Sequence, residues 1–135
     1  MSVAKILAGM TNHLLELDSA FPTSRENRDF NPDVLTAWQK IDLLPASPDN
    51  TTIGQTHYLE VGLMQVTLHY PLNKGAGEAL TNAEAIKEHF KRGTTIPHEG
   101  LQVMVTRTPS IAPALHDDKW YKVPISIFYQ SDVFI

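Results

Sequence analysis

The sequence predicts an α+β protein in which two helices pack on one face of a mostly antiparallel or mixed β-sheet, as a two-layer sandwich. Three kinds of signal predict this fold. Apolar residues at helical spacing open the chain, and the signature of a helix N-terminus stands near residue 81. Three segments alternate apolar and polar side chains with the period of two that a half-buried strand requires. In chain order the signals predict α-β-β-α-β-β.

The first helix is expected from Ser2 to Ser19. Its apolar residues recur at spacings of three and four, so they form one stripe of a helix. Ser2 suits the N-cap, and Pro22 stops the helix because the residue before a proline is pushed out of the α region. The following residues, 21–33, hold prolines and short polar side chains and predict an ordered loop. The apolar stripe consists of Val3, Ile6, Leu7, Met10, Leu14 and Leu17.

A weakly patterned strand and a clearly patterned strand come next. Apolar residues alternate from Leu35 to Leu43, although Trp38 and Gln39 interrupt the pattern. A polar turn over residues 45–52 then leads to a clean alternation over residues 64–70. Before this second strand, Gly62 marks a bulge or a bend. Pro71 ends the strand because proline has no amide hydrogen for the ladder.

The second helix is expected to begin at Thr81, where Thr81 and Glu84 match a capping box. It follows a glycine-containing loop, residues 72–78. The helix should end near Arg92, because basic residues suit the last turn and Gly93 suits a left-handed cap. Its inner face would contain Ala83, Ile86 and Phe90.

Two further strands are expected over residues 101–107 and 121–130. Pro124 lies within the second of them and cannot donate to a ladder. That strand should therefore be an edge strand at Pro124, or the ladder should be interrupted there. The connection between the two strands, residues 108–119, is long enough to project from the body, and this loop and the loop 72–78 are expected to be the most mobile.

Composition predicts one soluble domain over residues 1–135. A chain of this length can bury a core that needs neither disulfides nor a structural metal. Cysteine is absent, and the formal charge of −4 comes without a basic block, so thiol chemistry is excluded and nucleic acid is not the default partner. Glu16 and Asp18 interrupt the N-terminal apolar run, which argues against a signal peptide, and no apolar stretch reaches membrane-spanning length. We therefore expect synthesis in the cytoplasm and no membrane contact.

Metal and cofactor sites are not expected. The six histidines form no HxH, HxxxH or HExxH spacing that would place two of them on one helix or strand face.

Catalytic motifs are equally weak. His116 beside Asp117 could pair an imidazole with a carboxylate, but no nucleophile elbow accompanies them, so a solvated loop is the simpler interpretation. Lys74 near two glycines lacks the ending of a phosphate loop and predicts a turn. Glu26 and Asp29 could form a carboxylate pair, although capping groups in a turn explain them as well. The sequence therefore does not predict an enzyme.

Several stretches in order along the chain resemble a known family. They follow the amphipathic first helix and read ENRDFNP at 26–32, IDLLPA at 41–46, GLMQVTLHYP at 62–71, KGAGEA at 74–79 and FKRG at 90–93. In this order the sequence resembles the small tail-completion or tail-terminator proteins of long-tailed bacteriophages, which include a phage-related domain of unknown function. The resemblance extends from the first helix to about Gly100 and continues more loosely beyond it.

This resemblance implies a structural virion protein that is not an enzyme and has no cofactor. Such a protein caps the head-proximal end of the tail tube, stops its polymerisation and offers a surface for joining the head. Its partners would be further copies of itself in a hexameric ring, the tail tube protein and a head-completion or connector protein. DNA would meet it only by passing through the ring lumen, where an acidic balance would not retain phosphates.

Assembly contacts are expected in projecting polar loops. The tryptophan among the candidates has charged neighbours at a strand entrance, which is typical of an interface anchor. Packing over the end of the sheet is the alternative interpretation of the same residue. The candidate interface residues are Lys74, Glu78, Asp117, Asp118 and Trp120.

Two other functions stay open at this point. A head-closure or connector ring protein of the phage neck would have a similar size and would bind the portal side instead of the tube. A small ligand-binding domain or hydrolase would need convergent polar residues around a pocket.

Overall fold

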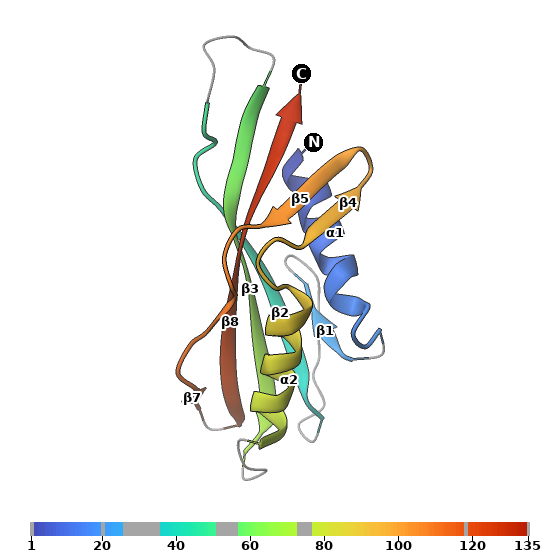
Figure 1. The fold of residues 1–135 in the computed structure, drawn as a ribbon. Coiled ribbons are helices and arrows are strands. Elements are labelled where there is room, and N and C mark those ends of the chain that lie inside the picture. Colours follow the sequence, from blue (N-terminus) through green and yellow to red (C-terminus); the bar gives the residue numbers. More distant parts are fainter. Residues whose placement is uncertain are drawn as a thin grey trace.

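The computed structural model describes residues 2–19, 21–25, 36–50, 57–72, 77–117 and 119–134. These residues form two helices and one eight-stranded mixed sheet, which confirms the α+β class (Figure 1). The elements are α1 (Ser2–Leu15), β1 (Thr23–Ser24), β2 (Trp38–Pro45), β3 (His57–Pro71), α2 (Gly77–His89), β4 (Thr95–His98), β5 (Leu101–Val105), β6 (Ser110–Ile111), β7 (Leu115–His116) and β8 (Trp120–Phe134). Glu26, Asp29, Leu35 and residues 51–52, for which predictions were made above, lie outside the described residues.

Two long antiparallel strands, β3 and β8, form the spine of the sheet (Figure 1). They pair along their whole length, from His57 opposite Phe134 to Pro71 opposite Trp120. The strand β2 pairs with the free edge of β3, and β5, β6 and β7 follow one another along the free edge of β8. Only β1 and β2 pair in parallel. The sheet curls, which brings β4 and β5 beside α1.

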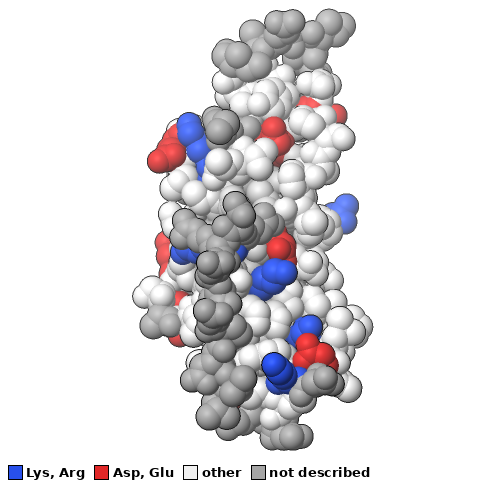
Figure 2. All heavy atoms as spheres, turned by 180° about the vertical axis from the view of Figure 1, so that it is seen from behind, with Lys and Arg blue, Asp and Glu red and all other residues white. Residues whose placement is uncertain are grey.

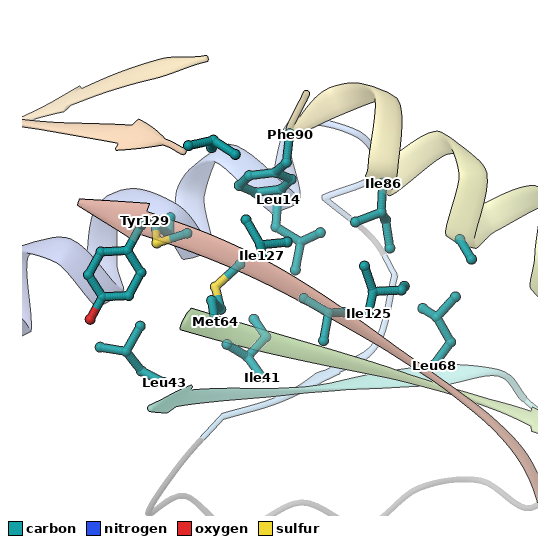
Figure 3. Close-up of a cluster of buried hydrophobic side chains, with 14 of the residues drawn as sticks. Leu14, Ile41, Leu43, Met64, Leu68, Ile86, Phe90, Ile125, Ile127 and Tyr129 are labelled. Atoms are coloured by element: carbon teal, nitrogen blue, oxygen red, sulfur yellow. The ribbon is translucent and has the colours of Figure 1, made fainter. Parts of the chain in front are cut away.

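The hydrophobic core lies between the two helices and the inner face of β2, β3 and β8 (Figure 3). Alternate residues of these strands point to this face, as the period of two predicts. Both helices contribute one apolar stripe each. Fully buried members include Ile6, Met10, Ile41, Met64, Val66, Leu68, Ile86, Phe90, Ile125 and Ile127. Neither helix has the length and apolar content to span a membrane, within the part of the chain that the structure describes.

The first helix ends at Leu15, earlier than the predicted Ser19. A side chain takes over the bond that would continue the helix, because the carbonyl of His13 accepts a hydrogen bond from Nε2 of His89 at 2.7 Å. The amide of Leu17, which would otherwise bond to that carbonyl, donates to Leu14 at 3.2 Å instead.

The second helix begins at Gly77, about one turn before the predicted Thr81. Thr81 and Glu84 therefore lie inside the helix and do not form a capping box. The earlier start is explained by Ala79, which extends the buried stripe by a turn and is fully buried. The predicted inner face is confirmed for Ala83 and Ile86, but the helix ends at His89, before the predicted Arg92, and the fully buried Phe90 follows it. Gly93 adopts the expected left-handed conformation with φ of 91°.

The hairpin of β4 and β5 contains a strand that the sequence analysis missed. Glu99 and Gly100 both have positive φ, at 48° and 87°, as a two-residue type I′ turn requires. The connection after β5, which was expected to project, follows β8 through the short strands β6 and β7 instead. Its backbone groups thereby gain ladder partners that a projecting loop would lack.

Gly62 does not form a bulge, because the register runs through it without a break, opposite Pro45 on one side and Tyr129 on the other. Position 62 requires glycine because there is no room for a side chain. A Cβ atom there would lie 2.7 Å from the hydroxyl oxygen of Tyr129 and 2.7 Å from the carbonyl oxygen of Leu44.

Pro124 lies inside a central strand, so the predicted edge strand is wrong. The ladder with β3 runs through Pro124, and the predicted interruption is found only on the other side of β8. The carbonyl of Pro124 accepts from the amide of Ala112 at 2.9 Å, and its nitrogen faces the same side. That side is the gap between β6 and β7, where a missing amide hydrogen costs no ladder bond.

Candidate assembly interface

The turn between β7 and β8 is organised by Asp117. Its Oδ1 accepts hydrogen bonds from the amides of Lys119 and Trp120, each at 2.8 Å, and its Oδ2 lies 3.0 Å from Nζ of Lys122. These groups favour the carboxylate, so the pKa of Asp117 is held far below its ordinary value, first by the Lys119 amide and then by Lys122. Asp117 is thus an exposed carboxylate held in place beside the start of β8, with a fixed negative charge.

Trp120 packs within the subunit at this turn. Only 7% of the residue is exposed, and its ring meets Trp38 edge-on at a centroid distance of 5.8 Å. His69 stacks on Trp38 at 3.8 Å, with its Nδ1 3.1 Å from the carbonyl oxygen of Thr67. Burial lowers the pKa of His69, which favours the neutral imidazole. The three rings form an aromatic cluster at one end of the sheet's outer face.

Glu78 lies at the same end of the molecule as this turn, in the exposed first turn of α2 (Figure 1). The pairing of Pro71 with Trp120 joins the two regions, since the chain runs from Pro71 into α2. The structure therefore brings Glu78, Asp117 and Trp120 to one end. Lys74 and Asp118 lie outside the described residues.

A second cluster, which the sequence analysis missed, joins the C-terminal ends of the helices. His13 and His89 stack at 3.9 Å, and each ring donates from Nε2 to the other residue's backbone carbonyl, at 3.0 and 2.7 Å. Glu16 completes the cluster, with Oε2 3.0 Å from Nδ1 of His13. Each helix thus caps the other. The sequence did contain one signal for this cluster, because His13 and Glu16 are three residues apart on one helix and so lie on the same face.

This cluster is the group of potential metal ligands found among the described residues. The two imidazole planes lie only 10° apart. Lone pairs on ring nitrogens lie in the ring plane, so those of His13 and His89 run nearly parallel and do not converge on one ion. Both Nε2 atoms are also used as donors to carbonyls. The arrangement therefore fits a hydrogen-bonded clamp and not a metal centre.

The outer face of the spine carries an apolar depression, which we call the outer groove. Leu44, Leu63 and Phe128 line it from three neighbouring strands, and its volume is about 450 Å³. The guanidinium of Arg107 lies over the ring of Phe128, 4.9 Å from its centroid, at the rim. Leu44 is 49% exposed. The outer groove is therefore an apolar surface with one cation beside it.

Beyond the outer groove β3 and β8 continue as an extension, which we call the arm, made of residues 57–59 and 132–134, and Asp49 pairs with Leu59 at its base (Figure 1). His57 and Asp132 are paired across it, Nε2 to Oδ1, at 2.7 Å. Phe134 at its tip is 76% exposed. No described strand pairs with residues 132–134 on the side away from β3, because β5 pairs with β8 only up to Ser131.

The charged side chains of the described residues are scattered over the face opposite the view of Figure 1 (Figure 2). Lys and Arg side chains there alternate with Asp and Glu side chains within a largely uncharged surface. This distribution suits protein contacts better than phosphate binding.

The sequence matches the family of phage tail terminator proteins over residues 5–129. The chain belongs to this family. No curated protein is significantly similar in sequence to this tail terminator family member.

Solved structures show the same fold. Nine chains match, and one of them is 21% identical, with a TM-score of 0.76 over 98% of this chain and 94% of its own length. The fold of this tail terminator family member is therefore one that is already seen in solved structures.

Family membership gives this terminator protein a structural role in the phage tail and a place in the virion. The family is one of structural proteins and not a class of enzymes. Association with other tail components is what such a protein requires, so its exposed turn, outer groove and arm are candidate contact surfaces.

Proposed function

We propose that this protein caps the head-proximal end of the tail tube, stops tube polymerisation and provides the surface to which the head is joined. The observation that carries the proposal is the match to the tail terminator family over residues 5–129. The protein acts as a single domain, residues 1–135, in a hexameric ring. Its partners are the tube protein, a head-completion or connector protein and its own copies, and DNA only passes through the lumen.

Two distinct ends of the subunit support this function. A cap must bind the growing tube through one surface and refuse another tube subunit through the opposite one. The long spine separates the arm from the end that carries Glu78, Asp117 and Trp120 (Figure 1). We propose that this latter end, with Lys74 and Asp118, contacts a neighbouring tail component. The bonds that hold Asp117 lower the cost of ordering the turn on binding.

Removal of the protein during phage assembly tests the function. Without it, tails should be tubes of uncontrolled length that do not join heads, and supplying the protein in trans should restore both length and joining. Tails of normal length that fail only in joining would instead indicate a head-closure or connector protein of the neck. Tails of normal length that attach to heads would contradict both assignments.

A further inference from the structure

We propose that the arm of one subunit docks into the outer groove of a second copy of this chain, with Asp132 of one copy beside Arg107 of the other. This inference deepens the proposed function. It rests on that function only where it says that the contacts close into a ring. The contact itself is a property of the chain and can be tested without tails.

The outer groove has the character of a docking site. Its floor consists of side chains from three adjacent strands that are held in register by ladder pairing, so it is preformed. Leu44 leaves nearly half of its surface in water. Arg107 supplies a positive charge at the rim, fixed over Phe128 by a cation–π contact. A partner that fits must present an exposed apolar side chain with a carboxylate close to it.

The arm presents that combination. Phe134 is the most exposed large hydrophobic residue among those described, and Asp132 is exposed two residues away on the same face of β8. His57 holds the Asp132 carboxylate at 2.7 Å, and its ring lies 4.9 Å from that of Phe134. The contacts with His57 therefore fix the position of the Phe134 ring relative to the Asp132 carboxylate.

The arm cannot fill the outer groove of its own subunit. Phe134 and Phe128 lie on the same face of one continuous strand, roughly 20 Å apart at about 3.3 Å per residue. The strand β8 stays paired with β3 over this whole length. Folding back would break that ladder and lose its hydrogen bonds. A second copy is thus the occupant that complements both the apolar floor and Arg107.

Such a contact joins two different surfaces, so each subunit offers one free arm and one free groove. Heterologous contacts of this kind propagate from subunit to subunit and close into a ring when the rotation permits. The free backbone edge of residues 132–134 also lies in the contact.

Charge exchange tests the proposal. Arg107→Asp alone and Asp132→Arg alone should each weaken self-association roughly tenfold or more, because like charges then face each other. An equimolar mixture of the two variants should restore association, since each groove then meets an arm of opposite charge. The readout is sedimentation velocity over a concentration series up to the solubility limit, together with melting of each variant to verify folding. Glu84→Arg and Arg92→Asp, exposed on and after α2, are the matched controls and should leave association unchanged.

A cysteine cross-link gives a second readout that does not depend on charge reversal. The chain has no native cysteine, so background is absent. A Phe134→Cys chain mixed with a Leu44→Cys chain should form a disulfide-linked heterodimer on oxidation, faster than a control pair of Phe134→Cys with Ala85→Cys on the exposed face of α2. Equal rates for both pairs, failure of the mixture to restore association, or a wild-type chain that stays monomeric throughout would each overturn the inference. These outcomes do not depend on whether the protein caps tail tubes. The contact between arm and outer groove and the capping function can therefore be contradicted independently.

Discussion

His13 and His89 cap each other's helices, because each ring donates from Nε2 to the backbone carbonyl of the other residue, at 3.0 and 2.7 Å. The exchange joins two helices whose partners are 76 residues apart in sequence. It places a hydrogen-bonded clamp at both helix C-termini, where the carbonyls of His13 and His89 lack the amide that would bond to them in a continued helix.

Replacing either histidine should destabilise the fold. His13→Ala and His89→Ala should each lower the free energy of unfolding by about 1 to 2 kcal/mol, since a carbonyl loses its donor and the stack is lost. The double variant should cost less than the sum, because one interaction is counted twice. Urea denaturation of all three chains measures the coupling, with exposed His116→Ala as the control. Simple additivity would show that the two rings do not act together.

Metal should not stabilise the protein. The parallel imidazole planes of His13 and His89 do not aim at one ion, and the helices are already held to the sheet by a hydrophobic core. Melting curves with added Zn²⁺, with chelator and with neither should coincide. A rise of many degrees in Zn²⁺ that His13→Ala removes would show that the cluster is a metal site after all.

Gly62→Ala should destabilise the fold by about 1 to 3 kcal/mol, as overpacking does. The added Cβ would lie 2.7 Å from the hydroxyl oxygen of Tyr129 and 2.9 Å from Cα of Pro45. Tyr129→Phe should relieve part of the loss in the double variant, because it removes one of the clashing atoms. Gly77→Ala has open space and serves as control. If thermal or chemical unfolding gave the same loss of stability for Gly62→Ala and Gly77→Ala, the proposed clash at position 62 would be contradicted.

Acidification should weaken the protein through His69. Burial lowers the pKa of this imidazole in the folded state, so on acidification below the unfolded-state pKa of about 6.5 the unfolded chain binds a proton that the folded chain does not. Stability from this group is complete above that pH and falls as the pH is lowered further. Urea midpoints of wild type and His69→Gln between neutral and mildly acidic pH measure it. The slope with pH should be smaller in the variant, and an equal slope would rule out His69 as its source.

Local patterns predicted much of the fold. The stripe through Ile6, Met10 and Leu14 and the alternation from Met64 to Tyr70 are where burial is highest, because a single buried face imposes its period on the sequence. Burial also explains why the second helix does not begin at Thr81, as its capping signature predicted. The earlier start buries Ala79 and so extends the apolar stripe of the helix.

Contacts between residues far apart in the chain could not be predicted from local sequence patterns. Spacing rules compare residues on one element, so they could not bring His89 to His13 and Glu16. The same limit applies to the outer groove, whose lining comes from β2, β3 and β8 and depends on register. The β4 strand was missed because Pro97 and the Glu-Gly turn weaken its local signal. Of the candidate interface residues, polarity and position placed Glu78 and Asp117 on the surface, while Trp120 is buried against Trp38 on the outer face of the sheet.

Control of tube length tests the central claim most directly. Purified tail tube protein is allowed to polymerise on its initiating complex, this protein is added at successive times, and tube lengths are measured by electron microscopy. The account predicts that growth stops at the moment of addition, with density from this protein at the growing end only. Tubes that continue to lengthen at the control rate, with folded protein present in excess, would contradict it.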